Sequence, residues 1–204
     1  AGLQIGQQVG GRMFDMMSQR IFGNDSTQSL SKENFLAGFM AALQKKGMNV
    51  TMEEANAYVQ SKAEAIKEKA TEAQFAENKA AGEKFLAENA KKEGVKTTPS
   101  GLQYKVIKEG NGAIPTDSSK VKVNYKGTLI DGTQFDSSYD RKEPTTFKAN
   151  QVIKGWTEAL TMMPVGSKWE LYIPQDLAYG SREAGQIKPF STLIFEVELV
   201  DIEK

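Results

Sequence analysis

Hydrophobic and polar residues alternate along three segments in the second half of the chain. In each segment apolar side chains recur at every second position, so they share one side of an extended backbone. The first segment is followed by Asp131-Gly132, a favoured hairpin turn. The pattern predicts strands that bury one face, with the inward residues Val121, Val123, Tyr125 and Leu129, then Trp169, Leu171 and Ile173, then Leu193, Phe195, Val197 and Leu199.

A different periodicity occurs between these segments, in the stretch WTEALTMM. Four apolar residues there fall at positions i, i+3, i+4 and i+7, which is the spacing of one helical face. They are Trp156, Ala159, Leu160 and Met163. An antiparallel sheet with one such helix across its apolar face is an α+β domain, which we assign to residues 95–204.

Residues 1–49 contain two amphipathic stretches rich in methionine and phenylalanine. In SKENFLAGFMAAL the apolar residues have helical spacing behind Ser31, a good N-cap residue, and a second candidate helix precedes it. Two short helices bury little surface alone, and methionine is adaptable and common at interfaces. We therefore favour a helical dimerisation domain that self-associates through Met13, Met16, Met17, Phe35 and Phe39. A small helical hairpin that packs on its own chain is the alternative.

Residues 50–94 are rich in Ala, Glu and Lys and contain no proline. The stretch begins with a capping box, Thr51 to Glu54, and after Ile66 the run KEKATEAQFAENKAAGEK keeps only Phe75 as a large apolar side chain. A helix that is polar nearly all round is typical of a segment that crosses solvent between two bodies. At 1.5 Å per residue, about 40 residues would span roughly 60 Å. We expect a long stalk helix, with a disordered charged linker as the alternative.

Composition excludes several kinds of chemistry. The chain of 204 residues has 26 basic and 26 acidic residues, so its net charge of zero gives no general attraction to nucleic acid. It has no cysteine and no histidine, which excludes disulfides, thiolate nucleophiles, Ser-His pairs and the usual zinc sites. We expect neither a cofactor nor a metal. No apolar run approaches the about 18 residues of a membrane span, although a leader or lipid-anchor segment is presumed to have been removed.

Four motifs together carry a family resemblance. VKVNYKGTLIDGTQFDSSYDR, QVIKGWTEAL, VGSKWELYIPQDLAYG and STLIFEVELVDI occur in the order and spacing of the FKBP-type peptidyl-prolyl isomerases. With a charged helix and a helical zone ahead of these motifs, the chain resembles the Mip-type bacterial subgroup. The resemblance implies a curved antiparallel sheet wrapped around the short helix. It also implies dimers joined through N-terminal helices and isomerase domains held on long stalks.

The resemblance also implies an apolar pocket for a proline ring. Trp156 would form its floor, Asp136 would lie at its mouth beside Arg141, and the Tyr179 hydroxyl and Ile153 N–H would hydrogen-bond the peptide's carbonyls. On this basis Asp136, Tyr179 and Ile153 are the candidate catalytic residues. The candidate substrate-binding residues are Tyr125, Phe135, Arg141, Val152, Trp156, Ile187 and Phe195.

Residue types alone leave simpler alternatives. Asp136 equally fits a turn carboxylate or a plain partner for Arg141, and the aromatic residues fit ordinary core packing. The sequence also departs from well-known members, which often have an aromatic residue where Thr145 stands and a histidine in the loop that here reads GSREAGQIKPF. These departures bear on macrolide affinity and substrate preference more than on isomerisation.

The resemblance implies a peptidyl-prolyl cis-trans isomerase that acts on proline-containing polypeptide clients. Macrolides are candidate inhibitors. A dimeric holdase chaperone, or a peptide-binding module with incidental isomerase activity, is the alternative function, and both functions can occur together. Mip-type proteins usually work in the periplasm or on the cell envelope, so we expect that location, with the cytoplasm as the alternative.

Overall fold

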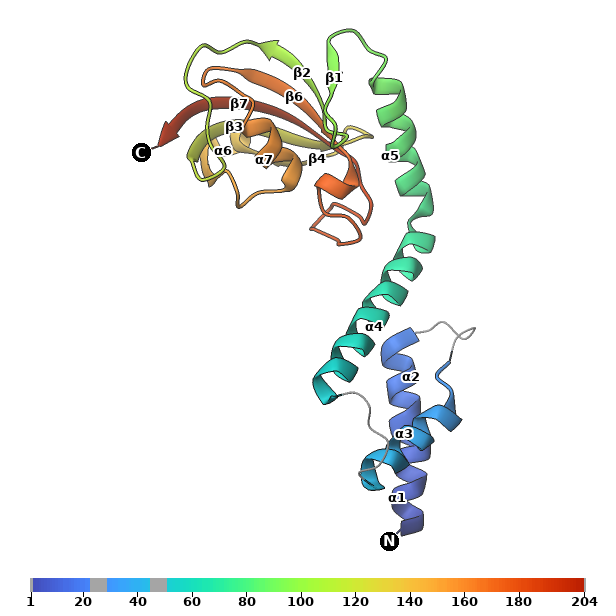
Figure 1. Cartoon of the computed structure of the whole chain (residues 1–204). Helices are drawn as coiled ribbons and strands as arrows, with labels where there is room; N and C mark the ends of the chain where they lie inside the picture. The colour runs from blue at the N-terminus through green and yellow to red at the C-terminus, as the bar shows by residue number, and fades with distance from the viewer. Residues whose placement is uncertain (1, 23–28, 45–50, 204) are drawn as a thin grey trace. The chain divides into compact units, whose positions relative to one another are not determined.

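The computed structural model describes residues 2–22, 29–44 and 51–203 (Figure 1). The chain divides into two compact units between Thr71 and Glu72. The predicted boundary at residues 49 and 50 lies outside the described residues. The second unit contains both the predicted sheet domain, residues 95–204, and the helix that precedes it.

The first unit is helical. Its elements are α1 (Gly2–Gln8), a π-helical turn η1 (Val9–Met13), α2 (Phe14–Phe22), α3 (Lys32–Gln44) and most of α4 (Met52–Gln74). The Phe14 and Phe35 rings meet edge to face at 5.5 Å and join α2 to α3. The Ser31 hydroxyl accepts a hydrogen bond from the Asn34 N–H at 3.2 Å, which confirms the predicted cap.

The predicted capping box is also confirmed. The Glu54 carboxylate accepts from the Thr51 N–H at 2.7 Å, and the Thr51 hydroxyl accepts from the Glu54 N–H at 3.1 Å. These bonds satisfy N–H groups that the first turn of α4 cannot pair internally. Hydrogen bonds from the Thr51 backbone and side chain lower the pKa of the Glu54 carboxyl, which favours the ionised, hydrogen-bond-accepting form.

The predicted stalk is interrupted and is therefore not one continuous helix. Helix α4 ends at Gln74, Phe75 adopts φ −111° and ψ 23°, and a second helix, α5, runs from Ala76 to Asn89. Gly82 and Asn89 of α5 are buried against the sheet, so this helix does not cross solvent. Besides the Phe85 ring, which packs on Tyr172, its contacts come from small and amide side chains, which give no apolar periodicity.

The second unit contains an antiparallel sheet that curves around a short helix, α7 (Lys154–Leu160) (Figure 1). The strand order is β1-β2-β6-β7-β3-β4, and β5 pairs with β3. This arrangement confirms the predicted α+β class. The strands are β1 (Val95–Thr97), β2 (Gln103–Lys108), β3 (Lys120–Leu129), β4 (Gln134–Ser137), β5 (Thr145–Lys148), β6 (Lys168–Ile173) and β7 (Leu193–Glu203).

Helix α7 packs on the apolar face of the sheet. Trp156, Ala159 and Leu160 are buried in one cluster with the inward residues of β3, β6 and β7. Close packing requires a glycine at the start of the helix, because a Cβ on Gly155 would lie 2.5 Å from Ile173 Cγ2. The Ile153 carbonyl begins the helix by accepting from the Trp156 and Thr157 N–H groups. The packing of α7 on the sheet therefore fixes the position and orientation of the Trp156 indole.

Replacing Gly155 by alanine should destabilise the fold, because the added methyl group must push α7 away from β6. Overpacking of this kind costs about 1–3 kcal/mol, so the midpoint of thermal unfolding measured by circular dichroism should fall. Gly38→Ala in α3 is the control, because its Cβ would meet nothing within 4 Å and alanine favours a helix. An unchanged midpoint in Gly155→Ala would contradict the close packing of α7.

Candidate functional site

Trp156 lies at the centre of a group of aromatic rings. Its ring centroid is 5.2 Å from that of Tyr125, 5.2 Å from Phe195 and 5.7 Å from Phe147, each with planes 82° to 87° apart. Phe135 meets Phe195 edge to face at 5.4 Å. We call these five residues the aromatic cluster. Edge-to-face packing stabilises an aromatic pair by more than the burial of its surface alone, and it fixes the orientation of the rings.

The sheet brings these rings together from separate strands. Tyr125 is on β3, Phe135 on β4, Phe147 on β5 and Phe195 on β7. Gly127 of β3 lies opposite Phe195 in the register, and a Cβ there would be 2.6 Å from the Phe135 ring and 2.7 Å from the Phe195 ring. The two phenylalanines can therefore meet only because this strand position has no side chain.

Hydrogen bonds join three polar side chains at the edge of the aromatic cluster. The Tyr125 hydroxyl donates to Asp136 Oδ2 at 2.5 Å, and Arg141 donates to Asp136 Oδ1 at 2.7 Å. Arg141 also donates to the Tyr125 hydroxyl at 2.8 Å and to the Thr145 hydroxyl at 3.2 Å. Arg141 ends the short helix α6 (Ser138–Arg141), and Lys142 leaves that helix with φ 58°. We call Tyr125, Asp136 and Arg141 the polar triad.

The triad keeps fixed protonation states near neutral pH. Burial disfavours ionisation of Asp136, but hydrogen bonds from Tyr125 and Arg141 outweigh it and lower the pKa of Asp136 from 3.8. Burial and the hydrogen bond to Asp136 raise the pKa of Tyr125 above 10. The bonds to Asp136 and Tyr125 raise the pKa of Arg141. A carboxylate with so low a pKa is a poor general base at pH 7.

The remaining candidate residues surround the same core. Val152, Ile153 and Tyr179 are half-buried, Ile187 is buried, and all four pack in or against the apolar core that contains Trp156. Among the described residues, no hydrogen-bond acceptor meets the Ile153 N–H or the Tyr179 hydroxyl. These two donors are available to a ligand.

Two residues of this site were not predicted from the sequence. Phe147 contacts both Tyr125 and Trp156, and Gly127 makes room for two rings. Phe147 belongs to a strand of four residues, Thr145–Lys148, which is too short for a clear alternation. The signal for Gly127 was its place on the inward face of β3, between Tyr125 and Leu129, where an apolar side chain is expected.

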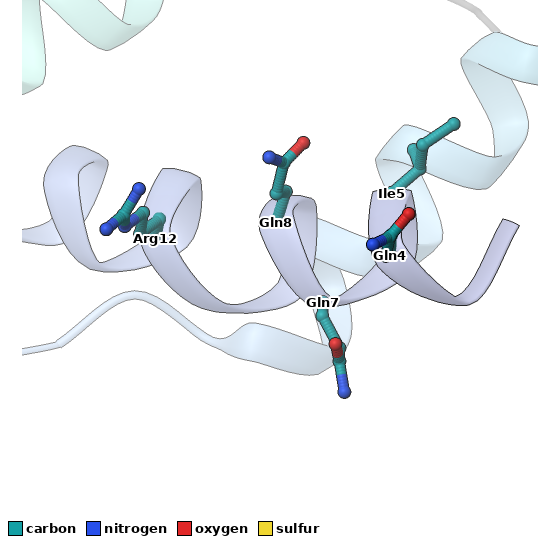
Figure 2. A pocket seen from close by; sticks show the side chains of 5 residues that line it. All are labelled: Gln4, Ile5, Gln7, Gln8 and Arg12. Atoms are coloured by element: carbon teal, nitrogen blue, oxygen red, sulfur yellow. The ribbon is translucent and has the colours of Figure 1, made fainter. Parts of the chain in front are cut away.

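A separate surface hollow of about 570 Å³ occurs along α1 and η1 (Figure 2). Its lining contains amides, one guanidinium and one aliphatic side chain, and Figure 2 shows Gln7 and Gln8 pointing in different directions from the helix. This set has no nucleophile and no acid–base pair, so we do not assign catalysis to it. The lining residues are Gln4, Ile5, Gln7, Gln8 and Arg12.

Two features are absent from residues 2–22, 29–44 and 51–203. Within these ranges no group of three or more acidic side chains is placed to hold a metal ion. In the same ranges no helix has the length and apolar character needed to cross a membrane.

Family models match both parts of the chain. A model described as FKBP-type peptidyl-prolyl cis-trans isomerase matches residues 112–200. A second model, described as the domain amino terminal to FKBP-type peptidyl-prolyl isomerase, matches residues 1–106.

Curated relatives and a solved structure agree with these matches. The chain is 49% identical to the FKBP-type 22 kDa peptidyl-prolyl cis-trans isomerase of Escherichia coli strain K12, over 98% of this chain and 91% of that protein. It is 54% identical to the outer membrane protein MIP of Legionella longbeachae, over 63% of this chain and 55% of that protein. The crystal structure of FkpA from Escherichia coli superposes with a TM-score of 0.63 at 38% identity, over 99% of this chain and 94% of that one.

The carboxyl of Asp136 should titrate below 3.8, as measured by NMR of its carboxyl carbon. In Arg141→Ala the pKa should rise, because the hydrogen bond and the charge that favour the carboxylate are removed. Since the folded pKa lies below the unfolded one, Asp136 adds stability above its unfolded pKa and loses it as pH falls through the folded pKa. Lys148→Ala removes an exposed cation outside the triad and is the control. A pKa of Asp136 that stays unchanged in Arg141→Ala would contradict the assigned pairing.

Proposed function

The chain belongs to the FKBP-type peptidyl-prolyl cis-trans isomerases, and we propose that a proline ring of its polypeptide substrate lies on the aromatic cluster while the preceding peptide bond rotates. Family membership confirms the predicted resemblance and the enzymatic activity. The observation that carries the finer proposal is the Trp156 indole, held by three rings at near-right angles. A flat apolar face of this kind suits a saturated five-membered ring.

Rotation of a peptide bond before proline needs no covalent chemistry. Its barrier comes from the loss of amide resonance as the bond twists, and uncatalysed isomerisation takes tens to hundreds of seconds. The planar amide is more charge-separated than the twisted one, so an apolar environment favours the transition state relative to the ground state. The chain has no cysteine or histidine, and this mechanism uses neither.

The free donors beside the cluster would hold the substrate in place. We propose that the Ile153 N–H and the Tyr179 hydroxyl each donate a hydrogen bond to a carbonyl that flanks the proline. Support comes from the fact that no described residue accepts a bond from either group. Fixing both flanking carbonyls favours a turn that brings the peptide toward the twisted geometry, which is catalysis by orientation.

Asp136 would act through position and charge, because its lowered pKa makes it a poor base. Its two oxygens are held by Tyr125 and Arg141, so the carboxylate orients a ring of the aromatic cluster without entering the apolar surface. Arg141 also binds the Thr145 hydroxyl, at the position where well-known relatives often have an aromatic residue. We propose that macrolide inhibitors would lose an apolar contact there.

Tyr179→Phe should lower kcat/KM for proline peptides about tenfold, because one hydrogen bond to the substrate is lost in the transition state. A protease-coupled assay of a short proline peptide measures this. The matched control is Tyr104→Phe, since Tyr104 stacks on Trp169 at 4.5 Å, outside the aromatic cluster. Wild-type activity in Tyr179→Phe would overturn the role of this hydroxyl, and wild-type activity in Phe195→Ala as well would overturn the whole assignment.

We propose that the first unit forms a homodimer through α1, α2 and α3. Val9 is its one buried apolar residue among those described up to Thr71, whereas several larger side chains are exposed. A helical unit with so little core gains stability by burying this surface against a second copy. The exposed residues include Ile5, Met13, Met16, Met17, Leu36, Met40 and Leu43.

A chaperone role is the second candidate function. Tyr58 is 64% exposed and Val59 is 44% exposed on α4, which presents apolar side chains outside the proposed dimer contacts. We propose that they bind exposed apolar segments of unfolded clients. Two linked copies would raise the effective concentration of the second site for one client chain.

We also propose the cell envelope as the place of action. The support is the similarity to a protein named as an outer membrane protein in Legionella longbeachae. Folding of exported polypeptides there would supply proline-containing clients. The alternative is the cytoplasm.

Met16→Glu should convert the dimer to a monomer, because it places a charge among the apolar contacts. Sedimentation equilibrium at micromolar concentration should give twice the 22.4 kDa chain mass for the wild type and once that mass for the variant. Gln19→Glu adds the same charge at an exposed polar position on α2 and is the control. A monomeric wild type would overturn the dimer. If Met16→Glu keeps peptide isomerase activity but loses protection of an aggregating client, paired sites are needed for the chaperone role.

A further inference from the structure

The segment between η2 (Gln175–Leu177) and β7 forms an irregular loop, residues 181–191, that begins next to Tyr179 and carries Ile187. Backbone hydrogen bonds fold the loop onto itself and onto the residues just before it, where the Arg182 N–H donates to the Tyr179 carbonyl at 3.1 Å. The Phe190 N–H donates to the Gly180 carbonyl at 2.7 Å and closes its base, and Ala184 and Ile187 exchange bonds at its far end. The position of Ile187 therefore depends on what holds the base of the loop.

Helix α5 holds this base through one amide. Asn78 Nδ2 donates to the Pro189 carbonyl at 2.7 Å and to the Ser191 hydroxyl at 3.0 Å. The Ser191 hydroxyl in turn donates to the Lys188 carbonyl at 2.8 Å. A single side chain, 111 residues away in sequence from Pro189, thus fixes the Pro189 carbonyl directly and the Lys188 carbonyl through the Ser191 hydroxyl.

The backbone at this point needs such support. Phe190 has φ 59° and is 5% exposed, so a bulky residue is held in a left-handed conformation inside the fold. This conformation is unfavourable for residues other than glycine and persists only where surrounding contacts maintain it. Asn78 bonds the residues on both sides of Phe190, and the Lys79 ammonium lies 5.8 Å from the centre of the Phe190 ring.

The helix itself is fixed on the sheet, so it can act as a support. A Cβ on Gly82 would lie 2.4 Å from Thr192 Oγ1, and α5 therefore approaches β7 closely just beyond the loop. At the far end of α5 the buried Asn89 donates to Gln103 Oε1 at 3.0 Å, and Gln103 donates to the Leu86 carbonyl at 2.9 Å. These anchors do not involve the loop.

We propose that Asn78 is a positioning residue that sets the placement of Tyr179 and Ile187 and thereby the preference of the enzyme among residues flanking proline. The proposal rests on the proposed function, in which the aromatic cluster receives the proline ring. The peptide on either side of that ring must then pass groups outside the cluster, and the candidates are Tyr179, just before the loop, and Ile187 within it. A displaced loop changes these flanking contacts and leaves the surface for the ring intact.

The test measures kcat/KM for a series of tetrapeptides that differ only in the residue before proline, using the full chain at a temperature where every variant is folded by circular dichroism. Asn78→Asp keeps the shape of the side chain but can donate to neither partner. We expect it to lower kcat/KM about threefold to tenfold for some peptides and less for others, so that their ratio changes. Asn78→Gln keeps a donor amide and should restore part of the wild-type ratio.

Two control variants separate positioning from stability. Glu77→Ala changes the exposed neighbour of Asn78 and should leave every kcat/KM unchanged. Phe85→Leu loosens α5 where it contacts Tyr172, whose ring is 6.1 Å away, and should lower the unfolding midpoint without changing the ratio among peptides.

Two results would overturn the proposal. One is a wild-type kcat/KM for every peptide in Asn78→Asp while Tyr179→Phe is impaired, in which case the proposed function stands without the positioning role. The other is a kcat/KM that falls by the same factor for every peptide in Asn78→Asp, and by as much as in Phe85→Leu when the two variants lose the same amount of unfolding midpoint. That result would show a structural role alone. If Tyr179→Phe and Phe195→Ala are also fully active, the proposed function fails as well.

Discussion

The packing of the Trp156 indole is the constraint on which the rest of the site depends. A glycine precedes it so that α7 can lie against Ile173, and another glycine, Gly127, leaves room for the two phenylalanine rings on β4 and β7. No described residue accepts a hydrogen bond from the buried Trp156 Nε1. An unpaired buried N–H lowers stability, and a leucine at this position would have no such group. Trp156 therefore destabilises the fold through its N–H while it supplies a flat aromatic ring to the cluster.

In the proposed mechanism the substrate amide rotates on an apolar surface, and the charged groups of the site lie at the edge of that surface. Tyr125 connects the two regions, because its ring packs on Trp156 while its hydroxyl bonds Asp136 and Arg141. The carboxylate and the guanidinium satisfy each other at 2.7 Å, so neither needs a partner from the substrate. Both side chains are partly exposed, and their pairing adds little to stability. Its consequence is geometric, since the triad fixes the ring that forms one side of the aromatic cluster.

Strong periodicity made the larger elements predictable. Alternation located β3, β6 and β7, the i, i+3, i+4, i+7 spacing located α7, and the spacing of Thr51 and Glu54 located the start of α4. Features without periodicity were not predictable. The site residues Asp136, Tyr179 and Ile153 were assigned only through family resemblance, because a single carboxylate, phenol or backbone N–H has no local sequence signal of its role. Phe147 was missed because its strand has four residues, which is too few to establish alternation.

The docking of α5 was missed for a more general reason. A regular spacing of apolar residues reveals a helix that buries apolar side chains, whereas the polar contacts of α5 come from Asn78 and Asn89. Their bonds end on a backbone carbonyl, a hydroxyl and a side-chain amide, and Gly82 allows the close approach. Such an interface is specific because each polar group needs one particular partner. The helical conformation is interrupted at Phe75, three residues before Asn78. Asn78 and the 181–191 loop both belong to the second unit, residues 72–204, so these contacts are made without the helices of the first unit.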